Sequence, residues 1–374
     1  MHIPLAGYSS RCMKNEPSST TNEMESLRNH ISQLANLPES SSPIISAYLD
    51  LCETKDYLKS KLASWAGAAR STLDSKQRSS FDEARQEVLG VISREWPDDI
   101  RSVAVFSRRG EEPLLLVVPF SVSLDLHFDV SNMPSIFPLV QLKDRFHRFV
   151  VVIATDDVSR IFEVTLGAVS ESILTQRPEL GERLGREWGR ERFHQRKRES
   201  DSKFYRDQAT IITNLMSKRG LNHLILAGNP RHVAGLREIL PKHVGSRLIG
   251  ELFKTPARGD FSAVLEQAID TFVEAERAES RDTVSRLHEQ VRRGGLAVVG
   301  VDRSRDAILG GYASELVISE ELPKVEREEL TRLATARNLA IEVCEGDELL
   351  AGQGGVGCLL RYRPVLLPEE AMVV

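Results

Sequence analysis

Residues 148–154 read RFVVVIA, and five consecutive residues of this run are apolar. Successive side chains of a strand point to opposite faces of a sheet, so an uninterrupted apolar run predicts a strand that is buried on both faces. His223–Ala227 predicts a second buried strand. The turn Gly228-Asn229-Pro230 follows it directly, and a helix is expected next, with Asn229 as its cap and Pro230 at its first position.

The order of the elements around these strands indicates a ribonuclease-H-like central domain at residues 146–278. Two further strands are expected at 159–166 and 168–174, and a helix at 203–217 precedes the second buried strand. Three consecutive strands followed by helix, strand and helix are the order of a ribonuclease-H-like layered sheet. Phe261–Arg292 predicts one long helix that links this domain to the next.

The segments on either side predict an α+β domain at 21–145 and an α/β/α sandwich at 279–364. In the first, helices and strands are segregated, with helices expected at 24–34, 56–73 and 80–95 and strands at 44–51, 101–106, 114–118 and 122–128. In the second they alternate, with strands expected at 296–299, 316–319, 341–343 and 356–362 and helices at 303–309 and 325–337. The predicted fold class is a multidomain α/β protein with a disordered tail at 1–20 and a second tail at 365–374.

Length and composition exclude several classes of protein. The chain has 374 residues, of which 41% are hydrophobic and 28% charged, and its mean hydropathy is −0.25. No stretch approaches the roughly 18 apolar residues of a membrane helix, and the N-terminus does not have the pattern of a signal peptide. The four cysteines form no CxxC pair. We therefore expect a cytoplasmic protein with no disulfide framework, no cysteine zinc site and no membrane partner.

The charge is distributed unevenly along the chain. The net charge is −5, yet residues 182–206 carry nine Lys/Arg against five Asp/Glu, and the other residues carry 40 basic against 49 acidic groups. Residues 182–206 are therefore a basic arm, and the rest of the chain is acidic.

Aromatic residues are interleaved with arginines in the centre of this arm, at residues 186–198 (REWGRERFHQRKR). Arginine neutralises phosphates, and both arginine and aromatic rings stack on unpaired bases, so RNA with exposed bases is the expected target. The candidate RNA-binding residues are Arg186, Trp188, Arg190, Arg192, Phe193, His194, Arg196, Lys197 and Arg198. If about five of them met phosphates, binding would weaken with a log–log salt slope of roughly −3 to −5. The alternative interpretation is a solvated charged loop that leads into a helix.

Other motifs have simpler interpretations than catalysis. Gly352–Gly357 (GQGGVG) lacks the Lys-Ser/Thr of a P-loop, so a tight turn into an edge strand is expected rather than a nucleotide site. Turn and surface positions explain Asp156, Asp157 and Glu163, so a two-metal nuclease is not favoured. His223, ahead of an apolar run, is interpreted as a satisfied core residue rather than a ligand. We expect no cofactor and no metal.

Three segments carry a family resemblance: 192–199 (RFHQRKRE) followed by Tyr205, 310–322 (GGYASELVISEEL) and 354–362 (GGVGCLLRY). They resemble the archaeal and eukaryotic class-one release factors and Pelota, and specifically their bacterial relatives. The first segment is similar to the arginine-rich helix start that follows the release factors' Gly-Gly-Gln loop. The resemblance extends from about Phe149 to Arg363 and implies a C-terminal domain of the ribosomal-protein L7Ae-like type.

The chain departs from this family at the segment that carries its chemistry. Family release factors place a Gly-Gly-Gln tip in the peptidyl-transferase centre, where it helps water attack the peptidyl-tRNA ester. Residues 185–191 (GREWGRE) contain neither adjacent glycines nor a glutamine, and Gln353 precedes its glycine pair near the other end of the chain. Adjacent glycines permit a backbone geometry that Trp and Glu do not readily adopt. We therefore expect no hydrolase activity.

The resemblance implies a Balon-type hibernation factor that occupies the A site of idle 70S ribosomes. In this interpretation the arm reaches toward the peptidyl-transferase centre and contacts ribosomal RNA, and elongation factor Tu is the implied delivery partner or companion. Residues 315–348, with ten acidic and four basic residues, form a protein-binding face or serve only solubility. Two other functions stay open: a peptidyl-tRNA hydrolase acting in ribosome rescue, and a free RNA- or tRNA-binding module.

Overall fold

The computed structural model describes residues 21–98, 100–145, 148–156, 158–165, 168–176, 189–254, 256 and 260–363. Contacts divide these residues into two compact units with a mixed α/β fold. Unit 1 consists of the described residues up to Glu23 and those between Phe146 and Ala275, and unit 2 combines residues between Met24 and Arg145 with residues from Glu276 onward. Within the described ranges, none of the helices has both the length and the apolar character of a membrane-spanning segment.

The centre of unit 1 is a five-stranded sheet in the order β7-β6-β5-β8-β9. Its strands are β5 (Phe149–Ala154), β6 (Val158–Thr165), β7 (Ala168–Gln176), β8 (His223–Gly228) and β9 (Leu248–Leu252). β5 is antiparallel to β6 and parallel to β8, and its six residues are all buried, which confirms the predicted central strand. β9 is absent from the predicted elements because Gly250 and Glu251 interrupt its apolar pattern.

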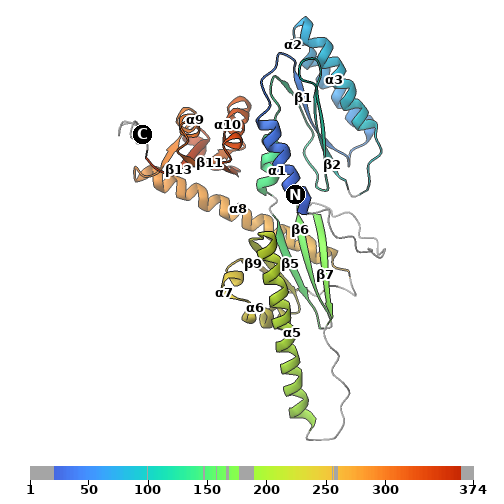
Figure 1. The fold of residues 1–374 in the computed structure, drawn as a ribbon, viewed down its shortest axis with the longest axis vertical. Helices are drawn as coiled ribbons and strands as arrows, with labels where there is room; N and C mark the ends of the chain where they lie inside the picture. The colour runs from blue at the N-terminus through green and yellow to red at the C-terminus, as the bar shows by residue number, and fades with distance from the viewer. Residues whose placement is uncertain are drawn as a thin grey trace. The chain divides into compact units, whose positions relative to one another are not determined.

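Helices cover both faces of this sheet (Figure 1). On one face lie α5 (Gly189–Arg219), α6 (Pro230–Ile239) and α7 (Lys242–Gly245). α8 (Ser262–Arg292) lies on the other and confirms the predicted long helix. Because side chains alternate along a strand, Val150 and Val152 of β5 pack in the core under α5 and α6. Phe149 faces α8, where Phe272 stacks on it with ring centroids 4.2 Å apart.

The turn between β8 and α6 is as predicted. Asn229 caps α6 by accepting a hydrogen bond from the Arg231 backbone N–H at 3.0 Å, and Pro230 opens the helix. Gly228 has φ of 114°, and a Cβ there would lie 2.0 Å from the carbonyl oxygen of Ala154 on β5. Only glycine permits both this φ and this close approach.

The first sheet of unit 2 is antiparallel, in the order β3-β2-β1-β4. Its strands are β1 (Ile44–Asp50), β2 (Ser102–Arg108), β3 (Leu114–Phe120) and β4 (His127–Ser131). Its helices are α1 (Thr21–Ala35), α2 (Lys55–Thr72) and α3 (Ser75–Ser93). β4 begins at His127, so the strand predicted at 122–128 is misplaced. α3 begins five residues before its predicted start, because Asp74 and Gln77 form a capping box.

The second sheet of unit 2 has the order β10-β13-β11-β12. Six of its elements alternate as predicted: β10 (Ala297–Val299), α9 (Val301–Leu309), β11 (Ala313–Ser319), α10 (Lys324–Ala336), β12 (Ala340–Cys344) and β13 (Val356–Leu360). The short helix α11 (Glu348–Gly352), between β12 and β13, is absent from the predicted elements. The prediction that Gly352–Gly357 leads into an edge strand is wrong. β13 pairs with β10 and β11 on its two sides, and all five of its residues are buried. The turn itself is present, with positive φ at Gly354 and Gly355.

A helix absent from the predicted elements, α4 (Phe137–Arg145), joins the two sheets of unit 2. The Glu328 carboxylate on α10 accepts hydrogen bonds from the backbone N–H groups of Ile136 at 2.8 Å and Phe137 at 3.2 Å. It also accepts one from the Ser135 hydroxyl at 2.5 Å. At the other end of α4, Asp144 accepts a hydrogen bond from the backbone N–H of Val343 at 2.8 Å. α4 is therefore held by residues almost 200 positions away in the sequence.

Candidate nucleic-acid interface

α5 consists of two halves with different composition. From Phe204 onward, residues at helical spacing are buried against the sheet of unit 1; they are Phe204, Tyr205, Ala209, Ile212 and Met216. The first half, residues 189–203, contains six Lys/Arg and three Asp/Glu and only one large apolar residue, Phe193. Figure 1 shows that this half of α5 extends past the sheet. At 1.5 Å per residue it is about 20 Å long.

Seven of the nine predicted RNA-binding residues lie in this first half of α5. They are Arg190, Arg192, Phe193, His194, Arg196, Lys197 and Arg198. Arg186 and Trp188 lie outside the described residues. The predicted helix start at Lys203, with a loop before it, is wrong, because α5 begins at Gly189. Arg, Glu, Gln and Lys have high helix propensity, so they form a helix here. They provide no periodic apolar residues, which is the pattern by which the other helices were predicted.

A helical arm distributes its charges in a regular way. Arg190, His194 and Lys197 are spaced by four and three residues, so their positions share one side of α5. Arg192 and Arg196 are four apart and occupy the opposite side. Cationic positions therefore surround the first half of α5, an arrangement suited to a cavity with phosphates on several sides.

Basic residues absent from the predicted set continue this positive surface. Lys203 and Arg206 are exposed on α5. Arg231 at the start of α6 is 62% exposed, and its guanidinium donates to the Asp201 carboxylate at 3.3 Å. Lys203 and Arg206 continue the spacing of Arg196 along the helix, a signal that the sequence contains, whereas Arg231 joins the group only through the packing of α6 on α5.

Two of the three candidate nuclease carboxylates, Asp156 and Glu163, are engaged by protein groups. Asp156, just after β5, contacts Nε2 of His232 at 2.8 Å. Glu163 on β6 is 1% exposed and accepts a hydrogen bond from Arg148 Nε at 3.0 Å, with Arg219 as a second partner. The surface position expected for Glu163 is wrong, because two arginines compensate its burial. Asp157 lies outside the described residues.

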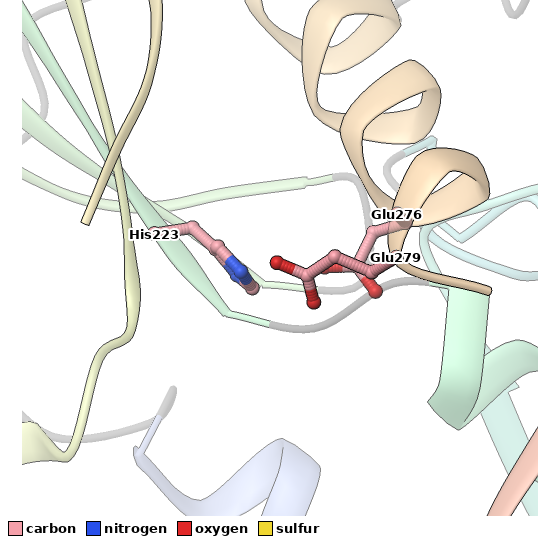
Figure 2. A group of neighbouring side chains, drawn as sticks. All are labelled: His223, Glu276 and Glu279. Carbon is pink, nitrogen blue, oxygen red and sulfur yellow. The ribbon is translucent and has the colours of Figure 1, made fainter. Parts of the chain in front are cut away.

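His223 stands at the start of β8 and is half-buried, with its ring 5.5 Å from that of Phe272. Figure 2 shows it with Glu276 and Glu279 of α8; the ligand atoms of the three lie within 4.8 Å of one another. Each of these side chains already interacts with other groups of the protein. We therefore assign no metal to this group.

The Gly352–Gly357 turn borders a cavity of about 370 Å³ beside α9. Glu321 and Glu326 line this cavity together with the backbone of Gly354 and Gly355. Two carboxylates repel a phosphate, and the cavity contains no Lys or Arg. The cavity is therefore unsuited to a nucleotide.

Comparisons with known proteins find relatives of this chain. Residues 134–272 match bacterial archaeo-eukaryotic release factor family 10. The Pelota homologue of Thermococcus gammatolerans is 27% identical over 195 residues, 48% of this chain and 54% of that protein. The Pelota homologue of Pyrococcus abyssi is 23% identical over 188 residues, 47% of this chain and 53% of that protein. The chain thus spans about half the length of the Pelota homologues it matches.

Similar solved structures include the archaeal translation termination factor aRF1, with 15% identity and a TM-score of 0.29 over 91% of this chain and 98% of that one. Ribosome-bound archaeal Pelota with ABCE1 has 16% identity and a TM-score of 0.43 over 91% and 94%. Dom34 of S. cerevisiae, described as interacting with Hbs1, has 13% identity and a TM-score of 0.43 over 71% and 82%. The ribonuclease-H-like and L7Ae-like assignments stay predictions.

Proposed function

Because the chain is a relative of the archaeo-eukaryotic release factors and Pelota, we propose that it is a non-catalytic ribosome-binding factor. It occupies the A site of idle 70S ribosomes as a hibernation or stress factor. The observation that carries the proposal is the first half of α5, a basic helix that extends past the sheet on which its second half packs.

The chemistry of this helix suits an RNA cavity. Its arginines and lysines neutralise phosphates, and Phe193 adds a ring that stacks on an unpaired base. An α-helix with its side chains is about 10–12 Å wide, and the first half of α5 is about 20 Å long, so it reaches deep into a cavity without unfolding. In the proposed complex it points toward the peptidyl-transferase centre and contacts ribosomal RNA.

The same segment supports a binding role without ester hydrolysis. Residues 185–191 (GREWGRE) do not contain the adjacent glycines and the glutamine of the release-factor tip. From Gly189 onward the segment is already helical. The backbone N–H groups of the first turn have no acceptor within the helix, so the case against ester hydrolysis rests on the missing glutamine and glycine pair.

Partners follow from the same relationship. One compared Pelota structure is described as ribosome-bound and Dom34 as interacting with Hbs1. For this chain we propose the 70S ribosome as the main partner and elongation factor Tu as the accompanying protein. The acidic segment 315–348 is the proposed protein-binding face.

Sedimentation tests ribosome binding directly. The full chain is expected to cosediment with purified 70S ribosomes at physiological salt and to bind free ribosomal RNA or tRNA more weakly. Replacement of Arg190, Arg192 and Arg196 by alanine should reduce cosedimentation at least tenfold. The matched control replaces Arg281 and Arg292 of α8 and the adjacent Arg293 by alanine; it removes the same charge elsewhere and should leave binding unchanged.

Two results would replace the proposal with another function. Release of nascent peptide from ribosomal complexes at saturating protein identifies a peptidyl-tRNA hydrolase. Equal affinity for bare RNA and for ribosomes identifies a free RNA-binding module. Competition with a tRNA bound in the A site then tests the location on the ribosome.

A further inference from the structure

We propose that Tyr205, His232 and Asp156 are positioning residues that aim the basic half of α5. The Tyr205 hydroxyl lies 2.6 Å from Nδ1 of His232, and Nε2 of His232 lies 2.8 Å from the Asp156 carboxylate. Tyr205 and His232 are buried, whereas Asp156 is 77% exposed. The chain of hydrogen bonds thus runs from α5 through α6 to the end of β5.

For a neutral His232 ring, the donors and acceptors of this hydrogen-bond chain have one consistent assignment. A carboxylate only accepts hydrogen bonds, so Nε2–H of His232 donates to Asp156. Nδ1 of the same neutral ring then accepts from the Tyr205 O–H. Asn229 supports the exposed end, because its side-chain amide donates to Asp156 at 3.3 Å. Each link therefore orients the next.

The hydrogen-bond chain from Tyr205 to Asp156 is located where the two halves of α5 meet. Tyr205 is among the first residues of α5 that are buried against the sheet. One turn earlier, the buried Asp201 accepts a hydrogen bond from Arg231, the neighbour of His232 on α6. Gly235 gives the Tyr205 ring its space, since a Cβ there would lie 2.6 Å from that ring. Two adjacent contacts, Tyr205–His232 and Asp201–Arg231, thus connect α6 to the point where the extended half of α5 begins.

A small tilt of α5 near Tyr205 displaces the first turn of the helix by a large distance. From residue 205 to residue 190 the helix measures about 22 Å, so a tilt of about 10° moves the first turn by about 4 Å. Binding groups need placement to within about 0.5 Å for full effect. The hydrogen-bond chain therefore determines whether the cationic side chains reach their phosphates together, and in this last step the inference rests on the proposed function.

The direct test is a distance between two spin labels in the full chain. Labels are attached at Gln195→Cys on the extended half of α5 and at Glu238→Cys, which is exposed on α6. Cys12 and Cys52 are replaced by serine. Cys344 and Cys358 stay in place, because burial raises the pKa of both thiols to about 12 and keeps them unreactive.

Tyr205→Phe removes only the hydroxyl. It is expected to broaden the distance distribution about twofold and to weaken 70S binding about threefold to tenfold, the effect of one hydrogen bond. Tyr48→Phe is the matched control, because its buried hydroxyl donates to the Ser135 carbonyl at 2.6 Å in unit 2. This control should lower stability and leave the label distance unchanged.

Two variants of His232 separate positioning from simple packing. His232→Asn keeps an acceptor near the position of Nδ1 and should retain the narrow distribution better than His232→Gln, which keeps a donor toward Asp156 and loses the acceptor for Tyr205. An unchanged width in Tyr205→Phe, or equal widths in the two His232 variants, overturns the inference. If the arginine triple variant binds ribosomes normally, the proposed function fails instead, and the label distances still decide the inference.

Discussion

Glu328→Ala is expected to destabilise unit 2 by about 2–4 kcal/mol. The carboxylate accepts three hydrogen bonds, two of them from the backbone N–H groups of Ile136 and Phe137, which are buried. Alanine leaves both N–H groups without an acceptor, and each such group costs about 1–3 kcal/mol. The expected loss of unfolding free energy is smaller than the sum of two full penalties, because the start of α4 relaxes partly in the variant.

Urea unfolding followed by tryptophan fluorescence measures this change. Trp65 and Trp96 pack in the first sheet of unit 2, and Trp188→Phe removes the one other tryptophan. Glu329→Ala is the matched control on the same helix, because Glu329 bonds to Arg305 at a partly exposed site. A surface pair of this kind contributes less than about 1 kcal/mol. A loss for Glu328→Ala no larger than the control contradicts the reasoning.

Glu328 also makes the stability of unit 2 depend on pH. Burial raises the pKa of its carboxyl group, although hydrogen bonds from Ser135, Ile136 and Phe137 act in the opposite direction. The folded protein therefore holds this proton more tightly than the unfolded chain. The free energy of unfolding should fall as pH rises from the usual glutamate range through the raised pKa. Glu328→Gln keeps an acceptor oxygen and should remove this slope; a slope that persists in the variant refutes the assignment.

Three other perturbations have defined outcomes. Glu163→Ala leaves Arg148 and Arg219 without their shared buried partner and should lower the stability of unit 1 by about 3–5 kcal/mol in urea unfolding. Gly228→Ala places a Cβ 2.0 Å from the Ala154 carbonyl oxygen at a φ of 114°, so a loss of about 3 kcal/mol or more is expected, and an unchanged melting temperature would show that the turn adapts. The alanine triple at Arg190, Arg192 and Arg196 should reduce the log–log salt slope of ribosome binding by about 2–3, measured by sedimentation between 50 and 200 mM salt; an unchanged slope moves the phosphate contacts elsewhere.

Most elements of the fold could be predicted because their local signals agree with their tertiary positions. β5 and β8 are apolar on both faces, and the Gly228-Asn229-Pro230 turn has residues that only one backbone path accommodates. The exceptions share a cause. α4 begins where Glu328 supplies acceptors from a distant segment, and no pattern within 137–145 indicates this. β13 has an ordinary short apolar pattern, and its central position depends on two partners elsewhere in the chain.

For the candidate interface too, part could be predicted from the sequence and part depends on the structure. Charge counting locates the arm at 186–198, because clustered arginines are a property of composition. Residue spacing did not predict the helical state of residues 189–203, since the second half of α5 provides a helix that the polar residues extend. Once a helix is nucleated, each added residue gains one backbone hydrogen bond in return for its ordering.

The amino-acid order alone determined that β5 and β8 are buried strands, where the positive charge lies and that the release-factor tip is missing, because hydropathy, charge and motif are local properties. Only the tertiary structure decided that Tyr205 meets His232, 27 positions away, and that His232 meets Asp156, 76 positions away. The first contact arises from the packing of α5 on α6, and the second arises because the parallel strands β5 and β8 bring their carboxyl ends to one edge of the sheet; the spacing of residues along the sequence indicates neither.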